Sequence, residues 1–346
     1  MTPHERTAAA GTIHVALAVY DPRGTYSQHT GVVMASIFEN TNDPVRIHIL
    51  HDETLSPINR QNLWETARRH GQSLDFVDVT AQRERLDERT LELVRDTCSI
   101  GTLYRLFIPD LLPLSRVIYL DSDIVVNLDI RELWDIPLDG NCLAGVLDHS
   151  REKSERLFSY EAVRARLLGC RLSSYVNAGV LVMDLNRIRE RGDFFRAAMD
   201  WLARHRYSAT LADQDILNAL FCGDIKLIEN KFNNRDIDGD ARESIMHAIR
   251  EPKPWTGLRG TPLEKLYWKT FLGTPWGEAM TSVETAELLL DLMRTSPQNH
   301  RRAAQCYHRI GERFWRDVLC NDVVSILGLL AQEVFYRLSD RLQRHR

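Results

Sequence analysis

The sequence predicts an α/β domain with a largely parallel central sheet, because short apolar segments alternate with segments of helical spacing through the first two thirds of the chain. The first apolar segment is rich in β-branched residues, and a later one, 117–120, stops abruptly at Asp121. We expect strands at 13–19, 45–50, 74–79, 117–120, 142–147 and 175–185. Helices are expected at 31–42, after Ser56-Pro57, at 83–95 and at 187–205.

Composition excludes some classes of protein. The 346 residues, 44% of them hydrophobic, can form one large core with an appendage or two ordinary domains. A net charge of −4 gives no global positive field, so a nucleic-acid partner is not expected. No apolar run reaches the roughly 18 residues of a membrane span, and the N-terminus lacks the apolar stretch of a secretory signal. Six scattered cysteines without a C-x-x-C pair favour reduced thiols, and we expect a cytoplasmic protein.

The composition changes after about residue 258. Residues 294–316 hold six arginines against one acidic residue, Glu312. Residues 323–342 then carry an apolar stripe at helical spacing. Two interpretations stay open. This region either lies on the surface of an anionic bilayer or forms a closing helix packed on the preceding domain.

The most informative segment is 117–126, where an apolar strand is interrupted by Asp121 and Asp123. In an extended chain, residues i and i+2 share one face about 6.6 Å apart, so both carboxylates can reach one cation while Ser122 points away. Two ionised carboxylates in apolar surroundings repel each other, and a divalent cation relieves that repulsion. Oxygen ligands favour Mg²⁺ or Mn²⁺, and an added imidazole favours Mn²⁺.

Two alternative interpretations of this motif exist. The aspartates could merely end a strand and cap a turn. They could also form the site of a dehalogenase-type phosphatase, with Asp121 as nucleophile and Asp123 as general acid. The second alternative is disfavoured because none of the other Gly-Asp dipeptides is followed by an aspartate four residues on. The chain has no P-loop and no strand–G-x-G-x-x-G–helix, so phosphate charge would be neutralised mainly by metal and side chains.

Several segments, read in order, resemble glycosyltransferase family 8, which includes bacterial lipopolysaccharide galactosyl- and glucosyltransferases and glycogenin. They are IHVALAVYD at 13–21, SIFENT at 36–41, TLYRLFIPDLLP at 102–113, RVIYLDSDIVV at 116–126, ELWDIPL at 132–138, YVNAGVLVMDL at 175–185, LADQDILNALF at 211–221 and MHAIREPKPW at 246–255. The resemblance covers roughly residues 12–258. LYWKTFLGTPW at 266–276 looks like the short C-terminal extension of bacterial members.

The resemblance implies a GT-A fold, meaning a Rossmann-like domain with a mixed, mostly parallel sheet, over residues 1–258. A helical extension over 259–346 would follow, with membrane or acceptor contacts. It also implies Mn²⁺ dependence, with Mg²⁺ as the second choice, and retention of anomeric configuration. The expected donor is UDP-glucose or UDP-galactose, and the expected acceptor is a glycan, a glycolipid or a lipopolysaccharide core. A sugar-nucleotide-binding protein without activity is the alternative.

The resemblance also assigns site residues. Asp121, Asp123 and His247 match the metal ligands, Asp213 and Gln214 lie around the reacting carbon, and Asp148 lies on the acceptor side. Donor-binding positions are Ala18, Tyr20, Asp21, Arg105, Asp121, Ser122, Asn177 and Lys253.

The sequence departs from the family pattern at two positions. Tyr20 stands where the family usually has an aspartate that reaches uracil, and Asp21 is the candidate substitute. Arg250 stands near a usual glycine beside the diphosphate, where it would either add a phosphate contact or crowd the site.

Overall fold

The structure is a computed structural model that describes residues 11–86, 90–91, 99–148, 159–205, 209–256 and 259–280. Within these residues, a seven-stranded sheet has the order β3-β2-β1-β4-β7-β6-β8. Its strands are β1 (Ile13–Val19), β2 (Val45–His51), β3 (Ser73–Asp78), β4 (Arg116–Leu120), β6 (Leu143–Leu147), β7 (Val176–Asp184) and β8 (Ile225–Leu227). β7 pairs antiparallel with β4 and β6, and the other pairs are parallel. The predicted mixed, mostly parallel sheet is confirmed.

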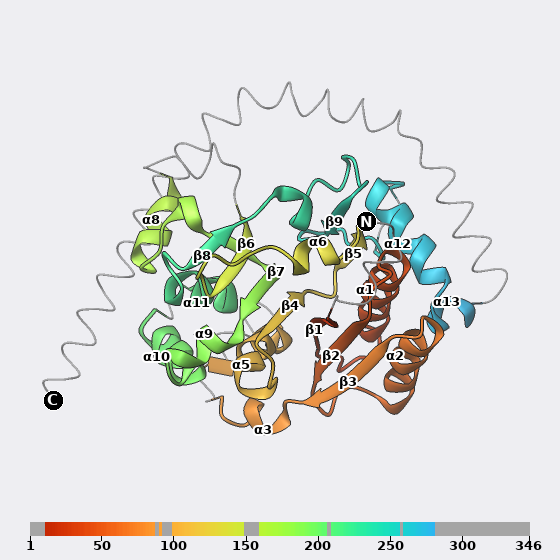
Figure 1. Cartoon of the computed structure of the whole chain (residues 1–346), viewed down its shortest axis with the longest axis horizontal. Coiled ribbons are helices and arrows are strands. Elements are labelled where there is room, and N and C mark those ends of the chain that lie inside the picture. The colour runs from red at the N-terminus through yellow and green to blue at the C-terminus, as the bar shows by residue number, and fades with distance from the viewer. Residues whose placement is uncertain are drawn as a thin grey trace, which may run out of the picture.

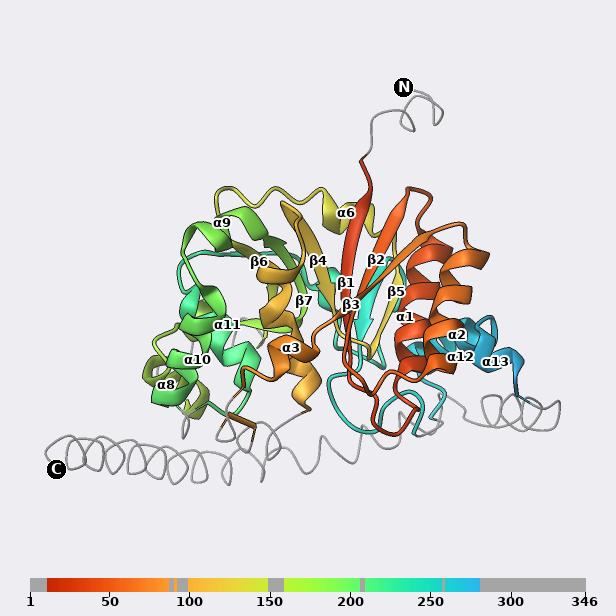
Figure 2. The ribbon, with the colours of Figure 1, turned by 90° about the horizontal axis from the view of Figure 1, so that it is seen from below.

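Helices cover both faces of this sheet, as Figures 1 and 2 show. The alternation of side chains along β4 explains why both faces are apolar: Val117 and Tyr119 enter one core cluster, while Ile118 and Leu120 enter the other. The first face packs against η2 (Ile100–Phe107), α5 (Ile108–Leu111), α8 (Tyr160–Leu167), α9 (Leu185–Glu190), α10 (Phe194–His205) and α11 (Ala212–Leu220). The second packs against α1 (Ser27–Asn40), α2 (Pro57–Arg69) and α6 (Arg131–Trp134).

The helix starts follow from capping. α2 begins at Pro57 as expected, because the Ser56 hydroxyl accepts a hydrogen bond from the Asn59 N–H. α1 begins at Ser27, four residues before the expected start, because the Asp21 carboxylate accepts the N–H groups of Tyr26 and Ser27. Only a short helix, α3 (Thr80–Arg83), opens the expected 83–95 segment, much of which lies outside the described residues.

The single helix expected at 187–205 is wrong. The chain forms α9 and α10 with a break at Gly192, whose φ of 94° lies in the left-handed region that glycine adopts without strain. The Asp193 carboxylate then accepts the Arg196 N–H in the first turn of α10.

A second, two-stranded sheet joins β5 (Ile124–Asn127) to β9 (Ser244–His247) in antiparallel register. It lies beside α1 and the late helices α12 (Pro262–Leu272) and α13 (Pro275–Glu278) (Figure 1). Leu263, Tyr267 and Phe271 of α12 share one core cluster with Val32 of α1 and Met246 of β9. The described start of the expected helical extension is therefore helical and packs directly on the preceding fold.

The expected division at residue 258 stays a prediction. The arginine-rich segment at 294–316 and the apolar stripe at 323–342 lie outside the described residues, and so does the membrane contact expected there. Among the described residues, no helix combines the length and apolarity that crossing a bilayer requires.

We predict that Leu263→Ala lowers the free energy of unfolding of the whole protein by about 2–5 kcal/mol, because Leu263 is 2% exposed in the shared cluster. Urea denaturation followed by fluorescence measures this change. The exposed Lys265→Ala on the same helix serves as the control and should change stability by less than about 0.5 kcal/mol. If α12 belonged to an independent unit, the main transition would not move.

Candidate active site

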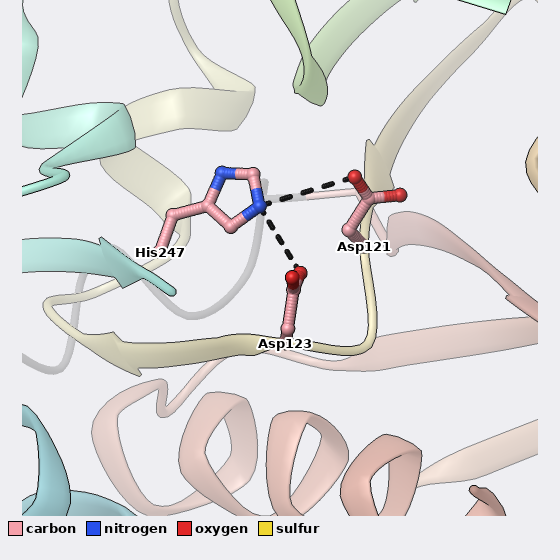
Figure 3. A group of neighbouring side chains, drawn as sticks. All are labelled: Asp121, Asp123 and His247. Atoms are coloured by element: carbon pink, nitrogen blue, oxygen red, sulfur yellow. Dashed lines mark ion pairs between the residues drawn. The ribbon is translucent and has the colours of Figure 1, made fainter. Parts of the chain in front are cut away.

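Asp121 and Asp123 lie in the turn that leads the chain from the large sheet to the small one. β4 ends at Leu120 and β5 begins at Ile124, so the motif is not the extended strand expected from the sequence. The turn exists because the two strands belong to different sheets. Both carboxylates nevertheless face His247 (Figure 3), while the Ser122 hydroxyl turns away to the hydroxyl of Thr30 at 2.9 Å.

His247 reaches this turn through strand pairing. It ends β9 and stands opposite Ile124, the residue after Asp123. Its Nε2 lies 3.0 Å from Asp123 Oδ1 and 3.9 Å from Asp121 Oδ2, as the dashed lines of Figure 3 mark. One ligand atom of each of the three residues lies within 4.8 Å of the others. The three residues predicted as metal ligands therefore meet at one point.

The donor set fits a divalent cation. Asp123 Oδ1 is buried and accepts no hydrogen bond within the described part of the chain. Adjacent ligands of an octahedral ion with bonds near 2.1 Å lie about 3 Å apart, which matches the distance from Asp123 Oδ1 to Nε2. Two carboxylates and one imidazole suit Mn²⁺ or Mg²⁺, with the nitrogen favouring Mn²⁺.

Gly179 leaves room for this cluster. A Cβ atom at this position in β7 would lie 2.2 Å from His247 Cε1 and 2.8 Å from Asp121 Oδ2. The Gly179 carbonyl also accepts the Asp121 N–H at 2.9 Å, so the glycine backbone touches the start of the turn. Only a residue without a side chain allows this approach.

Lys253 supplies positive charge to Asp123. Its Nζ donates to Asp123 Oδ2 at 2.7 Å and also to the carbonyl of Ala248. Burial works to raise the pKa of the Asp123 carboxyl, but His247 and Lys253 outweigh it and hold that pKa below its usual range. Asp123 therefore stays ionised, as a metal ligand must be.

The loop that carries Lys253 is held by the late helix α12. Trp255 stacks on His29 of α1 with ring centroids 3.6 Å apart. Trp268 of α12 donates its indole N–H to the Pro254 carbonyl at 3.0 Å, and Tyr267 bonds to His29 at 2.6 Å. Residues after 258 thus position a side chain of the site.

Arg105 is a buried ion-pair centre rather than a surface arginine of a helix. Its Nη2 donates to Asp121 Oδ1 at 2.7 Å, and its Nε lies 3.0 Å from Asp213 Oδ2. The residue is 3% exposed, and its guanidinium carbon lies 4.4 Å from the centre of the Tyr119 ring. Arg105 therefore joins the turn that carries Asp121 and Asp123 to α11.

Asp213 and Gln214, the predicted residues around the reacting carbon, lie at the start of α11. Burial, with the Asp121 charge adding to it and Arg105 opposing it, raises the pKa of Asp213 to about 6. Gln214 Oε1 accepts hydrogen bonds from the Ala178 N–H at 3.0 Å and from Asn177 Nδ2 at 3.1 Å. Two donors thus already engage the Gln214 oxygen.

A cavity of about 370 Å³ opens beside the turn that carries Asp121 and Asp123. Of the predicted donor-binding residues, six line it: Ala18, Tyr20, Asp21, Arg105, Asp121 and Ser122. Lys253 and Asn177 are not among its lining residues, but both are bonded within the site. Gly101 also lines it, and a Cβ atom there would lie 2.8 Å from the Cβ of Tyr20.

The Asp21 carboxylate is occupied by hydrogen bonds to groups of the protein itself. It is 2% exposed and accepts hydrogen bonds from the Tyr26 and Ser27 N–H groups, the Ser27 hydroxyl and Asn59 Nδ2. This carboxylate holds the start of α1, so it is poorly placed to replace the aspartate missing at Tyr20.

A groove of about 690 Å³ is lined by Asp148 and by Asn233, whose side chain bonds to His247. Asp148 Oδ1 accepts from Asn177 Nδ2 at 3.2 Å and from Arg235 Nη1 at 3.0 Å. Arg250 also lines this groove and is not among the residues lining the cavity with Tyr20.

The sequence analysis missed two members of the site, Asn233 and Gly179. Gly179 lies inside the V-N-A-G segment that pointed to Asn177, so its spacing could have indicated it. Asn233 bonds to His247 Nδ1 at 2.9 Å from the 3₁₀ helix η4 (Asn230–Asn233), and nothing in its local sequence signals that contact.

Comparison with known proteins gives concordant matches. A model of glycosyl transferase family 8 matches residues 18–256. A putative glycosyltransferase of Haemophilus influenzae is 26% identical over 216 residues, which cover 62% of this chain and 62% of that protein. Probable galacturonosyltransferase-like 10 of Arabidopsis thaliana is 26% identical over 276 residues, covering 76% of this chain and 71% of that protein.

Solved structures are similar as well. The galactosyltransferase LgtC, in complex with donor and acceptor sugar analogues, aligns with a TM-score of 0.61 at 22% identity, over 80% of this chain and 100% of that one. The bifunctional glycosyltransferase WbbM in its apo form aligns with a TM-score of 0.62 at 22% identity, over 82% and 52% of the two chains. At these identities the likeness shows the fold, which is GT-A.

We predict that Gly179→Ala weakens Mn²⁺ binding by about 10-fold or more, because the added methyl group overlaps the His247 ring. Isothermal titration calorimetry measures this affinity. Gly145→Ala on β6 is the control, since its methyl group would contact Val176 and Leu181 side chains at 3.1–3.2 Å instead. Equal Mn²⁺ affinity in folded Gly179→Ala protein would contradict the prediction.

A second prediction concerns pH. The folded-state pKa of Asp213, about 6, lies above its ordinary value of 3.8, so its ionisation destabilises the fold as pH rises through this window. In metal-free buffer, Asp213→Asn should therefore gain stability relative to wild type between pH 4 and pH 7, by about 3 kcal/mol for a shift of about two units. Denaturant unfolding at both pH values measures the difference. Asp200→Asn, whose wild-type side chain is 67% exposed, serves as the control for replacing a carboxylate by an amide.

Proposed function

Since this chain belongs to glycosyl transferase family 8, we propose that it transfers a hexose, glucose or galactose, from a UDP-sugar to a glycan or glycolipid acceptor with retention of configuration. The convergence of Asp121, Asp123 and His247 on one point carries the proposal. Asp121 lines the cavity with Tyr20, and Asn233, which bonds to His247, lines the groove with Asp148.

Asp121, Asp123 and His247 would hold Mn²⁺, or Mg²⁺ as second choice. A divalent ion bound there supplies positive charge against the diphosphate of the leaving nucleotide. Lys253, whose Nζ lies 2.7 Å from Asp123 Oδ2, would add a second positive charge for the phosphate oxygens. Binding that strengthens as the leaving group gains charge accelerates the reaction.

The residues around the reacting carbon favour a front-face displacement. An amide is a weak nucleophile, and the Gln214 oxygen already accepts two hydrogen bonds, from Ala178 and Asn177. We therefore assign Gln214 and Asp213 to orienting the sugar and stabilising positive charge on the ring. The acceptor would enter from the groove beside Asp148, on the face that the nucleotide leaves.

The hydrogen bonds of Asp121 also argue against the phosphatase alternative. Its Oδ1 accepts from Arg105 Nη2 at 2.7 Å and from the Tyr119 hydroxyl at 2.9 Å. Its Oδ2 faces His247, at 3.9 Å from Nε2. This arrangement fits a ligand held in place better than a free nucleophile.

The proposal is tested by incubating the protein with UDP-glucose, UDP-galactose and UDP-galacturonate, with Mn²⁺ and with a chelator, and by following slow donor hydrolysis. One UDP-sugar should be hydrolysed only with metal, and ¹H NMR of the first-formed sugar should show the donor's anomer. Hydrolysis of simple phosphoesters instead, or donor binding without turnover, would replace the proposal with one of its alternatives.

We predict that Asp123→Asn lowers metal-dependent turnover by about 100-fold or more, since losing a charged ligand removes several kcal/mol of transition-state stabilisation. Asp135→Asn, whose side chain is 63% exposed, is the matched control and should keep wild-type turnover. Full activity of Asp123→Asn across a Mn²⁺ titration would exclude the proposed metal role.

A further inference from the structure

The imidazole of His247 must present a lone pair at Nε2 to bind a cation, so its proton must lie on Nδ1. In water a neutral imidazole exchanges between both arrangements. His247 is 3% exposed, and therefore the protein groups around Nδ1, rather than bulk water, decide where the proton lies. The group facing Nδ1 is the side-chain oxygen of Asn233, at 2.9 Å.

The orientation of the Asn233 amide follows from a backbone group. The Gly179 N–H can only donate, and it bonds to Asn177 Oδ1 at 3.0 Å. At its other end, Asn177 Nδ2 faces the Asp148 carboxylate, which accepts and which donates nothing when ionised. Asn177 is therefore fixed at both ends, with its oxygen toward Gly179.

This orientation passes to the next amide. Asn233 lies 2.9 Å from Asn177 Oδ1, so the atom that faces this oxygen must be the donating Nδ2. The oxygen of Asn233 then faces His247, and His247 Nδ1 must carry the proton that it donates. Three contacts therefore connect the Gly179 N–H of β7 to Nδ1 of His247: Gly179 to Asn177, Asn177 to Asn233, and Asn233 to His247. With the proton on Nδ1, the Nε2 atom of His247 keeps its lone pair toward Asp121 and Asp123.

Burial prevents water from replacing the hydrogen bonds of Asn177 and Asn233, so the two amides keep one orientation. Asn233 is 1% exposed and Asn177 is 8% exposed, so a lost hydrogen bond here leaves a buried polar group without compensation. Asn233 also comes from η4, whose next residue, Asn234, accepts the His247 N–H through its carbonyl at 2.8 Å. The same short segment therefore fixes both the backbone and the ring of His247.

We propose that Asn233 is a positioning residue of the metal centre, whose amide oxygen holds His247 in the Nδ1–H form that leaves Nε2 free for the cation. This inference rests on the metal site of the proposed function. Asn233 itself does not touch the cation; it acts through His247.

The experiment compares Asn233→Leu, Asn233→Asp and Asn234→Leu in the full-length protein. Asn234 is the matched control, because its side chain makes two hydrogen bonds, to the Asp240 carbonyl and from the Asp236 N–H, away from His247. Mn²⁺ affinity is measured by calorimetry and by electron paramagnetic resonance. The tautomer of His247 is read in metal-free protein at alkaline pH by ¹⁵N NMR, with His247→Gln to assign the signals.

We expect Asn233→Leu to weaken Mn²⁺ binding by about 10–100-fold and to move the His247 proton toward Nε2. Asn233→Asp keeps an acceptor at Nδ1 and should restore the Nδ1–H form and most of the affinity. Asn234→Leu should bind Mn²⁺ within about twofold of wild type. The wild-type protein should show the Nδ1–H form.

The outcomes distinguish a failure of the metal site from a failure of the role proposed for Asn233. If wild-type protein binds no Mn²⁺, the proposed function fails. If it binds Mn²⁺ but its metal-free His247 carries the proton on Nε2, or if Asn233→Leu keeps both the tautomer and the affinity, the inference about Asn233 is overturned while the metal site stands. The wild-type tautomer decides the question even if Asn233→Leu does not fold.

Discussion

The site depends on how two carboxylates are held close together at a turn between two sheets. Asp121 and Asp123 are separated by one residue, and two negative charges this close repel each other unless cationic groups or a metal ion lie between or beside them. The surrounding protein places two cationic side chains and one imidazole around them. Arg105 pairs with the first carboxylate, Lys253 with the second, and His247 faces both. Two carboxylates and one imidazole whose ligand atoms meet at one point are suited to bind a divalent cation.

This arrangement requires elements that are distant in sequence. β9 brings His247 beside β5, β7 contributes Gly179 where no side chain would fit, and α11 brings Asp213 to Arg105. The loop of Lys253 is fastened by α12, which follows the segment matched by the family model. The described helices after residue 258 therefore help to position Lys253.

The hydrogen-bonded amides of Asn177 and Asn233 fix the orientation of side chains around His247. Asn177 and Asn233 connect the Asp148 carboxylate to the imidazole of His247 through buried hydrogen bonds. Because each amide has one donor end and one acceptor end, turning one of them over would break contacts at both neighbours.

The sequence by itself determined the α/β class and most of the expected strands to within one or two residues, because alternating apolar segments have a direct physical meaning. The D-x-D in an apolar setting indicated the carboxylate pair, and the family resemblance added His247 as the third predicted ligand. The sequence failed where local pattern carries no information. Packing and capping decide three features: the helix break at Gly192, the turn between the two sheets, and the hydrogen bonds from Asp21 to the start of α1. Asn233 could not be found from its neighbours, since its role exists only when η4 lies against β9. Tertiary structure alone decided which buried polar groups face one another, because that choice is made by contacts between segments far apart in the chain.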